Sequence, residues 1–201
     1  MKYFIGNWKM FGVPKSISII SKINFFLKKD KNRNKYRVVI TPPYTLIETF
    51  AKYFKNKLVS IGAQNCFHKD LFSSNTGAIS PYMLKQIGSK YIIIGHSDNR
   101  SEGDSDQMLK DKLRFALMNN MKVIFCIGEN KKQKKNKQTF SVLKKQLLGV
   151  LEKKFNKNNI IIAYEPIWSI GTGMIPGPND LIKKTFFIKK MLKIIFNSKK
   201  T

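Results

Sequence analysis

Four polar side chains stand at the ends of apolar runs in this 201-residue sequence and could act together on a small substrate. They are the carboxylate of Glu165, the imidazole of His96, the ammonium of Lys9 and the carboxamide of Asn7. This set suits proton removal next to a carbonyl, because the carboxylate can take the proton while the donors stabilise the enediolate oxygens. A buried Glu–Lys pair with a capping histidine is the structural alternative.

Other site chemistries have weaker support. No serine or cysteine nucleophile stands with a base in an obvious motif, and neither G-x-G-x-x-G nor G-x-x-x-x-G-K-[ST] occurs. Cys66 and Cys126 lie far apart, with no histidine or second cysteine at ligand spacing. We therefore expect no metal site and two reduced, structural thiols.

Six short apolar runs predict the β-strands that position these side chains. Their starts are 21 to 37 residues apart, which is the length of a strand–helix–strand unit. The predicted strands are Phe4–Trp8, Val38–Thr41, Val59–Gln64, Tyr91–Gly95, Val123–Gly128 and Ile160–Glu165. Such runs, buried on both faces, are typical of a parallel sheet covered by helices.

The segments between the strands carry helical patterns. Apolar residues recur at helical spacing in two of them, at Ile17, Ile20, Ile23 and Phe26 or Leu27, and at Leu109, Leu113 and Leu117. Ser80-Pro81 predicts an N-cap followed by proline at the first helical position. An open doubly wound sheet and a closed (β/α)₈ barrel both remain possible, and both place their sites at the carboxyl ends of the strands.

The net charge of +26 raises the question of a polyanionic partner. Only four of the 38 basic residues are arginine, although base readout depends largely on arginine. The lysines are spread along polar segments, so we expect a solvated surface and no specific nucleic-acid partner. A binder of nucleic acid or anionic surfaces stays open as a minor hypothesis, which predicts salt-sensitive retention on heparin or DNA.

The sequence contains no sign of membrane insertion or export. No apolar stretch approaches the roughly 18 residues that a membrane span needs. The first ten residues, "MKYFIGNWKM", lack a signal-peptide core and a cleavage site. We expect a cytoplasmic protein without a membrane partner.

Six strings occur in order along the chain: "FIGNWKM", "GAQNCF", "NTGAIS", "YIIIGHSDNR", "VIFCIGE" and "IIAYEPIWSIGTG". Together they resemble the triosephosphate isomerase family, from residue 3 to about residue 190. The resemblance implies one domain, 1–201, that forms an incomplete TIM-type (β/α) barrel with six or seven of the eight parallel strands. It implies interconversion of dihydroxyacetone phosphate and D-glyceraldehyde 3-phosphate, in glycolysis and gluconeogenesis, with no cofactor or metal.

The resemblance also assigns roles to single residues. Glu165 would be the base that moves the proton between adjacent carbons. His96 would be the electrophile, a neutral imidazole at the start of a helix whose positive end disfavours the imidazolium. Lys9 would supply a fixed positive charge and Asn7 would help to fix the oxyanion. Asn7, Lys9 and the backbone N–H of Gly171 would bind the phosphorylated triose.

A mobile lid would cover the site, because water must be excluded from an enediolate that can expel its phosphate. Around Gly171 the lid would comprise Pro166, Ile167, Trp168, Ser169, Ile170, Thr172 and Gly173. Ser97 and Asp98 would support the site. Asp98 is one methylene shorter than the family's glutamate, which leaves its contact with Lys9 open.

The third loop of the family enters a twin subunit, which implies a homodimer. Gln64, Thr76 and Gly77 are the matching residues here, and we expect the loop to reach Asn7 and Lys9 of the twin. One charge pair of the family across that interface is replaced by Asn99 and Ala78. Both charges are lost together, so no charge would be left unpaired.

The largest departure from the family lies at the end of the sequence. The family has two further strands, with glycine-rich loops that bind the phosphate. Here "KIIFNSKKT", residues 193–201, could be a worn seventh strand with Asn197-Ser198 in place of glycines, and no eighth strand is present. Open sheet edges and loss of about 3–6 kcal/mol of phosphate binding would follow.

This departure supports an alternative function. The chain could be a catalytically impaired or inactive barrel remnant that acts as a structural or interaction protein. That alternative predicts undetectable isomerase activity.

Overall fold

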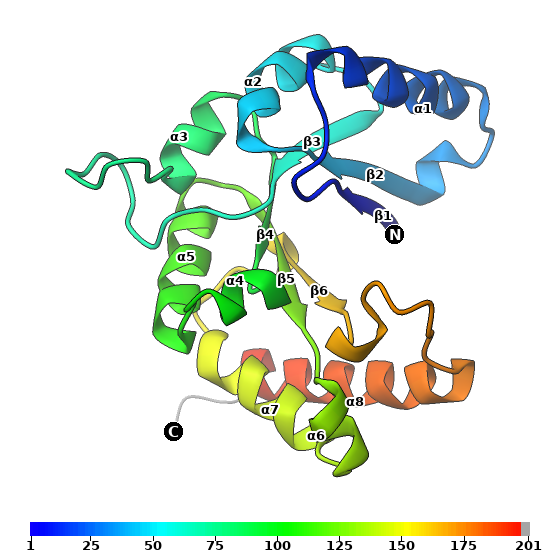
Figure 1. The fold of residues 1–201 in the computed structure, drawn as a ribbon, viewed down its shortest axis with the longest axis vertical. Helices are drawn as coiled ribbons and strands as arrows, with labels where there is room; N and C mark the ends of the chain where they lie inside the picture. The colour runs from blue at the N-terminus through cyan, green and yellow to red at the C-terminus, as the bar shows by residue number, and fades with distance from the viewer. Residues whose placement is uncertain (198–201) are drawn as a thin grey trace.

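The computed structural model describes residues 1–197. Its six strands form one parallel sheet in the order of the sequence, from β1 to β6 (Figure 1). The strands are β1 (Lys2–Asn7), β2 (Tyr36–Thr41), β3 (Val59–Ala63), β4 (Tyr91–Ile94), β5 (Lys122–Ile127) and β6 (Ile160–Tyr164). A doubly wound sheet would reverse its strand order. The sheet therefore has barrel topology, and all six predicted strands are confirmed.

The helices form an arc along one side of the curved sheet (Figure 1). They are α1 (Ile17–Lys29), α2 (Tyr44–Tyr53), α3 (Pro81–Gln86), α4 (Ser97–Ser101), α5 (Asp106–Met118), α6 (Lys131–Lys135), α7 (Thr139–Val150) and α8 (Pro178–Asn197). Four short 3₁₀ helices are η1 (Pro14–Ser16), η2 (Arg33–Lys35), η3 (Lys157–Asn159) and η4 (Ile167–Ser169). The predicted cap at α3 is confirmed, because the Ser80 hydroxyl accepts a hydrogen bond from the N–H of Met83 at 3.2 Å.

The sheet separates two apolar clusters. Ile92 and Ile94 of β4 belong to the larger cluster, which includes buried residues of the surrounding helices. Tyr91 and Ile93 of the same strand belong to a smaller cluster with Cys126 of β5, on the concave side. Both faces of β4 are therefore buried, which explains its unbroken apolar sequence.

The possible seventh strand is wrong. Residues 193–197 form the last turns of α8, and four side chains of this helix are buried at intervals of four and three residues: Lys184, Ile188, Met191 and Ile195. This is the period of a helix, not of a strand. Residues 198–201, including Ser198, lie outside the described residues.

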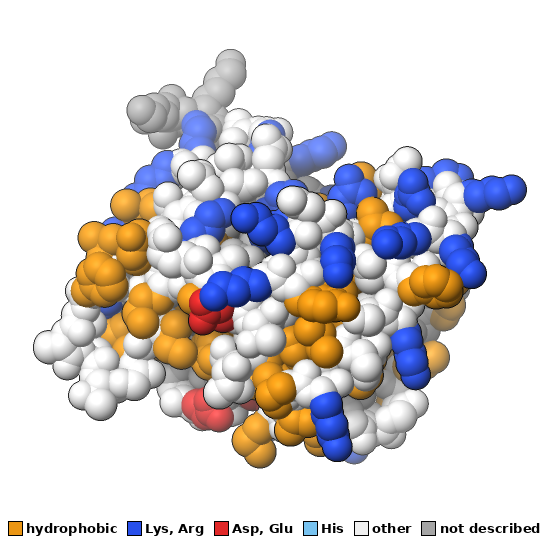
Figure 2. Space-filling model, turned by 90° about the horizontal axis from the view of Figure 1, so that it is seen from above, with side chains coloured by type: hydrophobic (Ala, Val, Ile, Leu, Met, Phe, Trp, Pro, Cys, Tyr) orange, Lys and Arg blue, Asp and Glu red, His pale blue; other side chains and the backbone are white. Residues whose placement is uncertain are grey.

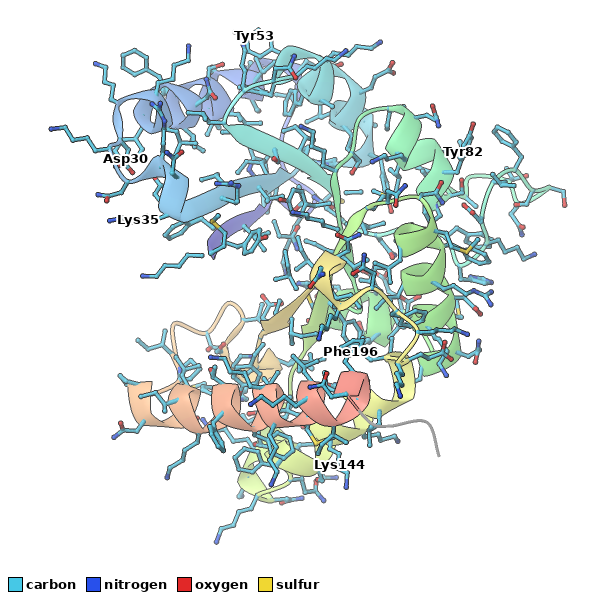
Figure 3. The ribbon with its side chains drawn as sticks, turned by 180° about the vertical axis from the view of Figure 1, so that it is seen from behind. Asp30, Lys35, Tyr53, Tyr82, Lys144 and Phe196 are labelled. Atoms are coloured by element: carbon cyan, nitrogen blue, oxygen red, sulfur yellow. The ribbon has the colours of Figure 1, made fainter. Side chains whose placement is uncertain are left out.

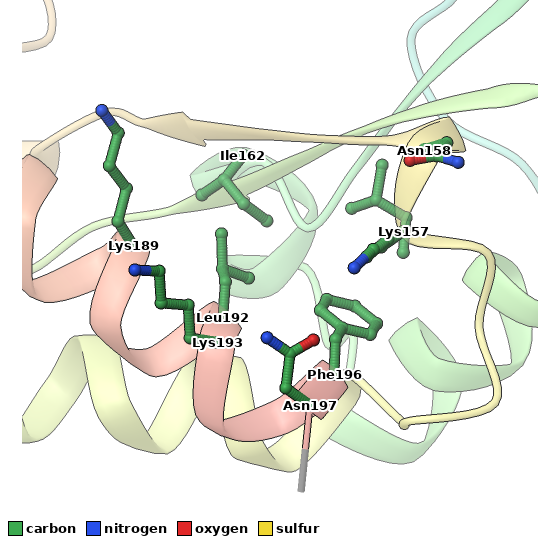
Figure 4. A pocket seen from close by; sticks show the side chains of 9 residues that line it. Lys157, Asn158, Ile162, Lys189, Leu192, Lys193, Phe196 and Asn197 are labelled. Carbon is green, nitrogen blue, oxygen red and sulfur yellow. The ribbon is translucent and has the colours of Figure 1, made fainter.

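The two ends of the sheet are open within residues 1–197. β1 pairs with β2 only, and β6 pairs with β5 only. A cavity of about 400 Å³ lies between β6 and α8 (Figure 4). Ile160, Ile162, Leu192 and Phe196 form part of its lining, and Figure 3 places Phe196 near the end of α8. The chain thus forms a half-barrel with apolar side chains at its open end.

The basic side chains show no single patch on the face drawn in Figure 2, where lysines and arginines are scattered among apolar and polar areas. Within residues 1–197, no helix is long and apolar enough to cross a membrane.

Candidate active site

Glu165 directly follows β6 at its carboxyl end. Its backbone N–H donates to the carbonyl of Ile127 in β5 at 2.9 Å, so the strand pairing continues into this residue. Gly128 makes this approach possible, because a Cβ atom there would lie 2.0 Å from the carbonyl oxygen of Glu165. The backbone of Glu165 is therefore fixed against β5, and its half-exposed carboxylate extends from the edge of the sheet.

The end of β1 holds Lys9 in a tight turn. The Asn7 Oδ1 atom accepts the backbone N–H of Lys9 at 2.9 Å, and Lys9 has a φ of 50°, in the left-handed region. The Gln64 side chain donates to the carbonyls of Lys9 and Thr41, both at 2.8 Å. An uncommon backbone conformation fixed by two side chains is typical of functional sites.

His96 follows β4 and caps α4. The N–H of Asp98 donates to His96 Nδ1 at 3.2 Å, so this nitrogen is an acceptor and the ring proton of a neutral imidazole lies on Nε2. His96 Nε2 is 3.4 Å from Glu165 Oε2. The imidazole is almost completely buried, and the two predicted catalytic groups are in contact.

Asp98 reaches Lys9 despite its shorter side chain. The Lys9 Nζ atom lies 3.2 Å from Asp98 Oδ2, which is also 3.5 Å from His96 Nδ1. The contact that the sequence left open is therefore made. Ser97 begins α4 and lines a small recess together with Glu165.

A cavity of about 500 Å³ opens over these residues. Its lining includes all four side chains at the ends of β1, β3 and β4, namely Asn7, Lys9, Gln64 and His96, together with Asp98. Glu165 lines instead a separate, narrow recess of about 10 Å³, together with Cys126. The Glu165 carboxylate thus approaches Nε2 of the imidazole, whereas the Lys9 ammonium is linked to the Nδ1 side through Asp98.

The predicted lid is anchored at its start and open at its tip. The N–H of Ile167 donates to the Glu129 carbonyl at 3.0 Å, and Trp168 Nε1 donates to Glu129 Oε1 at 3.0 Å. Gly171 and Gly173 are exposed, with φ of 69° and 71°. The structure does not bring Ser169, Ile170, Gly171, Thr172 or Gly173 to the cavity. Their contact with a substrate stays a prediction.

Two further residues support the site. Arg100 donates to the carbonyls of Gly95 at 2.8 Å and Cys126 at 3.3 Å, and so joins the loop after β4 to β5. The sequence offered a clue to Arg100, because it ends the "HSDNR" string that begins with His96. Glu129 is fully buried and accepts hydrogen bonds from the Tyr164 hydroxyl and from Trp168 Nε1, so it ties the end of β6 to the start of the lid.

The Cys126 thiol lies beside Glu165 in the same narrow recess. Burial raises the pKa of its thiol to about 12, and the nearby carboxylate of Glu165 adds to this effect. An un-ionised thiol is a poor nucleophile. This agrees with the predicted packing role.

The three residues predicted for the dimer loop lie in two different places. Gln64 lies in the site, whereas Thr76 and Gly77 are exposed on the segment between β3 and α3, which projects from the body in Figure 1. Within residues 1–197, no group of three or more His, Cys, Asp or Glu side chains could hold a metal ion.

Known proteins resemble this chain along most of its length. The triosephosphate isomerase of Thermodesulfovibrio yellowstonii is 32% identical over 98% of this chain and 80% of its own length. That of Saccharomyces cerevisiae is 36% identical over 94% and 76%, and that of Wolbachia pipientis wMel is 38% identical over 93% and 72%. The crystal structure of triosephosphate isomerase from Bartonella henselae matches with a TM-score of 0.87 and 29% identity, over 98% of this chain and 78% of that one.

The half-barrel of six parallel strands and these relatives define a cofactor-independent isomerase on an incomplete TIM-type α/β barrel. A family model described as triosephosphate isomerase matches residues 2–201. The chain belongs to the triosephosphate isomerase family.

Proposed function

We propose that this chain interconverts dihydroxyacetone phosphate and D-glyceraldehyde 3-phosphate through an enediolate. The observation that carries the proposal is the 3.4 Å approach of Glu165 Oε2 to His96 Nε2, because His96 lines the larger cavity together with Lys9 and so links the carboxylate to it. A base, a neutral hydrogen-bond donor and a cation are the groups that this reaction needs.

In the first step Glu165 removes a proton from the carbon next to the substrate carbonyl. His96 donates from Nε2 to the carbonyl oxygen, on which negative charge develops. His96 Nε2 gives its proton to the former carbonyl oxygen and takes the proton of the adjacent hydroxyl, and Glu165 returns the carbon-bound proton to the neighbouring carbon, so that the hydroxyl and carbonyl positions are exchanged. The 3.4 Å contact between Glu165 and His96 supports a reacting centre that both groups face, with the substrate bound between them.

Lys9 and Asn7 would stabilise the charge of the enediolate. The ammonium of Lys9 is held by Asp98 at 3.2 Å, and the Asn7 carboxamide closes the turn that directs it. Fixed charges of this kind require no reorganisation during the reaction. Closure of residues 166–173 would add the Gly171 N–H to the phosphate and exclude water.

Replacement of the base tests this mechanism. We expect Glu165→Gln to lower kcat about 10³-fold in a coupled isomerase assay, because general-base catalysis contributes about 10²- to 10⁴-fold. The matched control is Glu48→Gln, an exposed carboxylate of α2 that pairs with Lys52, and it should retain the kcat of the parent chain. Circular dichroism would show whether both variants keep the fold.

Two results would contradict the proposal. Full activity of Glu165→Gln would mean that the base is another residue. Absence of deuterium from the product after turnover in D₂O would argue against an enediolate, whose base exchanges its proton with solvent. A folded parent chain with no activity would instead support the inactive barrel remnant.

We also infer a homodimer, formed through the loop between β3 and α3. Leu71 and Phe72 of this loop are 55% and 78% exposed, and Phe72 contacts the ring of Tyr82, the α3 residue labelled in Figure 3. Exposed apolar side chains on a projecting loop favour a partner. Thr76 and Gly77 follow them toward the tip and would enter the twin near its Asn7 and Lys9.

Sedimentation equilibrium tests this assembly. We expect a dimer at micromolar concentration and a monomer for Phe72→Asp. Phe25→Asp is the control, because Phe25 is 60% exposed on α1, and it should leave the mass unchanged. A monomeric parent chain would contradict the inference. We place the enzyme in the cytoplasm, which the two unpaired, buried cysteines support.

A further inference from the structure

The first residues of the lid rest on a carboxylate that has no exposure to water. Glu129, after β5, is 0% exposed. It accepts hydrogen bonds from the Tyr164 hydroxyl at 3.1 and 3.2 Å and from Trp168 Nε1 at 3.0 Å. Tyr164 and Trp168 lie on either side of Glu165. A buried carboxylate also needs a compensating charge, because hydrogen bonds alone do not replace its hydration.

That charge comes from α8. The Lys184 side chain is 3% exposed, and its Nζ atom lies 4.0 Å from Glu129 Oε1. The same ammonium is 5.4 Å from the ring centre of Tyr164. Lys184 occupies the buried stripe of α8 together with Ile188, Met191 and Ile195. A lysine in a stripe that is otherwise apolar indicates a specific partner.

Lys184 also pairs with Asp180, one turn earlier on the same helix. The Asp180 side chain is 44% exposed, so water can solvate that carboxylate and screen its attraction. The Glu129 carboxylate has no such access. Lys184 thus donates its hydrogen bond to Asp180 and lies within ion-pair distance of Glu129, whose buried carboxylate has no water to compensate its charge.

We propose that Lys184 is a positioning residue of the active site. Its ammonium holds the Glu129 carboxylate, which holds Tyr164 and Trp168, and these fix the strand end and lid start that direct Glu165. Lys184 touches no substrate and acts through Glu129. The kinetic part of this proposal rests on the proposed isomerase activity, whereas the spectroscopic part does not.

Indole fluorescence tests the contact without a substrate. The chain has two tryptophans, so Trp8→Phe leaves Trp168 as the sole emitter. In this background we expect Lys184→Met to raise the acrylamide quenching constant of Trp168 about threefold, since the indole loses its fixed acceptor. Lys183→Met removes the neighbouring, exposed lysine of α8 and should leave the constant unchanged.

Kinetics test the positioning role. Lys184→Met should lower kcat about tenfold and leave KM within twofold, because Asn7 and Lys9 are untouched. Lys183→Met should match the parent chain in both constants. Because Lys184 acts through Glu129, adding Lys184→Met to Glu129→Gln should cause no further loss of kcat.

Each outcome bears on the proposal. Unchanged quenching and unchanged kcat in a folded Lys184→Met variant would overturn it, as would fully additive losses in the double variant. If Lys184→Met alone fails to fold, the double variant removes both charges and provides the comparison with Glu129→Gln. Altered quenching in a chain without isomerase activity would support the contact and reject the proposed function.

Discussion

His96 owes its hydrogen-bonding state to a single backbone amide. Two carboxylates approach its ring, Asp98 at 3.5 Å from Nδ1 and Glu165 at 3.4 Å from Nε2. Lys9 offsets the charge of Asp98, and the Asp98 N–H occupies the lone pair of Nδ1. The sequence suggested that a helix dipole keeps the ring neutral. The structure adds a direct contact, because the Asp98 N–H of this five-residue helix donates to Nδ1 and leaves Nε2 to face Glu165.

The buried thiols predict a loss of stability at alkaline pH. Burial raises the pKa of Cys66 from 9.0 to about 12. The folded thiol stays protonated while the unfolded thiol ionises, so its contribution is present below pH 9 and lost between pH 9 and 12. Relative to Cys66→Ala, we expect the parent chain to lose about 1.4 kcal/mol of unfolding free energy per pH unit there.

Urea denaturation at pH 8, 9, 10 and 11 measures this difference. Comparison with Cys66→Ala removes the contribution of the tyrosines, which ionise over the same range. Parallel stability curves for the two chains would contradict the prediction.

Residues at strand ends were the predictable part of the site. Asn7, His96 and Glu165 follow apolar runs, and parallel strands bring such ends to one edge, so their proximity follows from sequence. Lys184 could not be found this way. It is one of many lysines, and its burial depends on how α8 packs against the loop after β5.

Among the elements, the end of α8 shows that a short apolar run can be mistaken for a strand when it belongs to a helix. Ile194, Ile195 and Phe196 are β-branched or aromatic and are compatible with a strand when read alone. In the structure, the buried side chains Lys184, Ile188 and Met191 are spaced as on one face of a helix, and Ile195 extends this face by one turn. Short strands were predicted correctly because turn residues bound them, whereas no such residue separates 193–197 from the helix.

The cap of α5 predicts a measurable local contribution to stability. Ser105 Oγ accepts the N–H of Met108 at 3.2 Å, and the hydroxyl satisfies a donor of the first turn. We expect Ser105→Ala to lower the free energy of unfolding by about 1 kcal/mol, as is typical of N-cap serines. Ser74→Ala, in the exposed loop before α3, should change it by less than about 0.5 kcal/mol. Equal effects in urea denaturation would contradict the capping role.

At the scale of the whole fold, the half-barrel formed by residues 1–197 leaves β1 and β6 with one neighbouring strand each. Every residue of β6 is only partly buried although all five are apolar or aromatic, and Phe4 of β1 is 58% exposed. The sequence predicted the six strands from its six apolar runs. It also predicted the open edges, because six strands are too few to close an eight-stranded barrel. It could not predict the cavity between β6 and α8, which depends on how the helix packs on the final strand.

The charge of the whole chain predicts how salt affects catalysis. A net charge of +26 surrounds a site that we assign to a phosphorylated triose. Electrostatic attraction raises the association rate of such an anion, and salt shortens its range, from about 30 Å at 0.01 M to about 10 Å at 0.1 M. We therefore expect kcat/KM for D-glyceraldehyde 3-phosphate to fall about tenfold over that range. Glyceraldehyde without phosphate is the control and should change less than twofold. An equal response of both substrates would mean that the lysines do not attract the substrate.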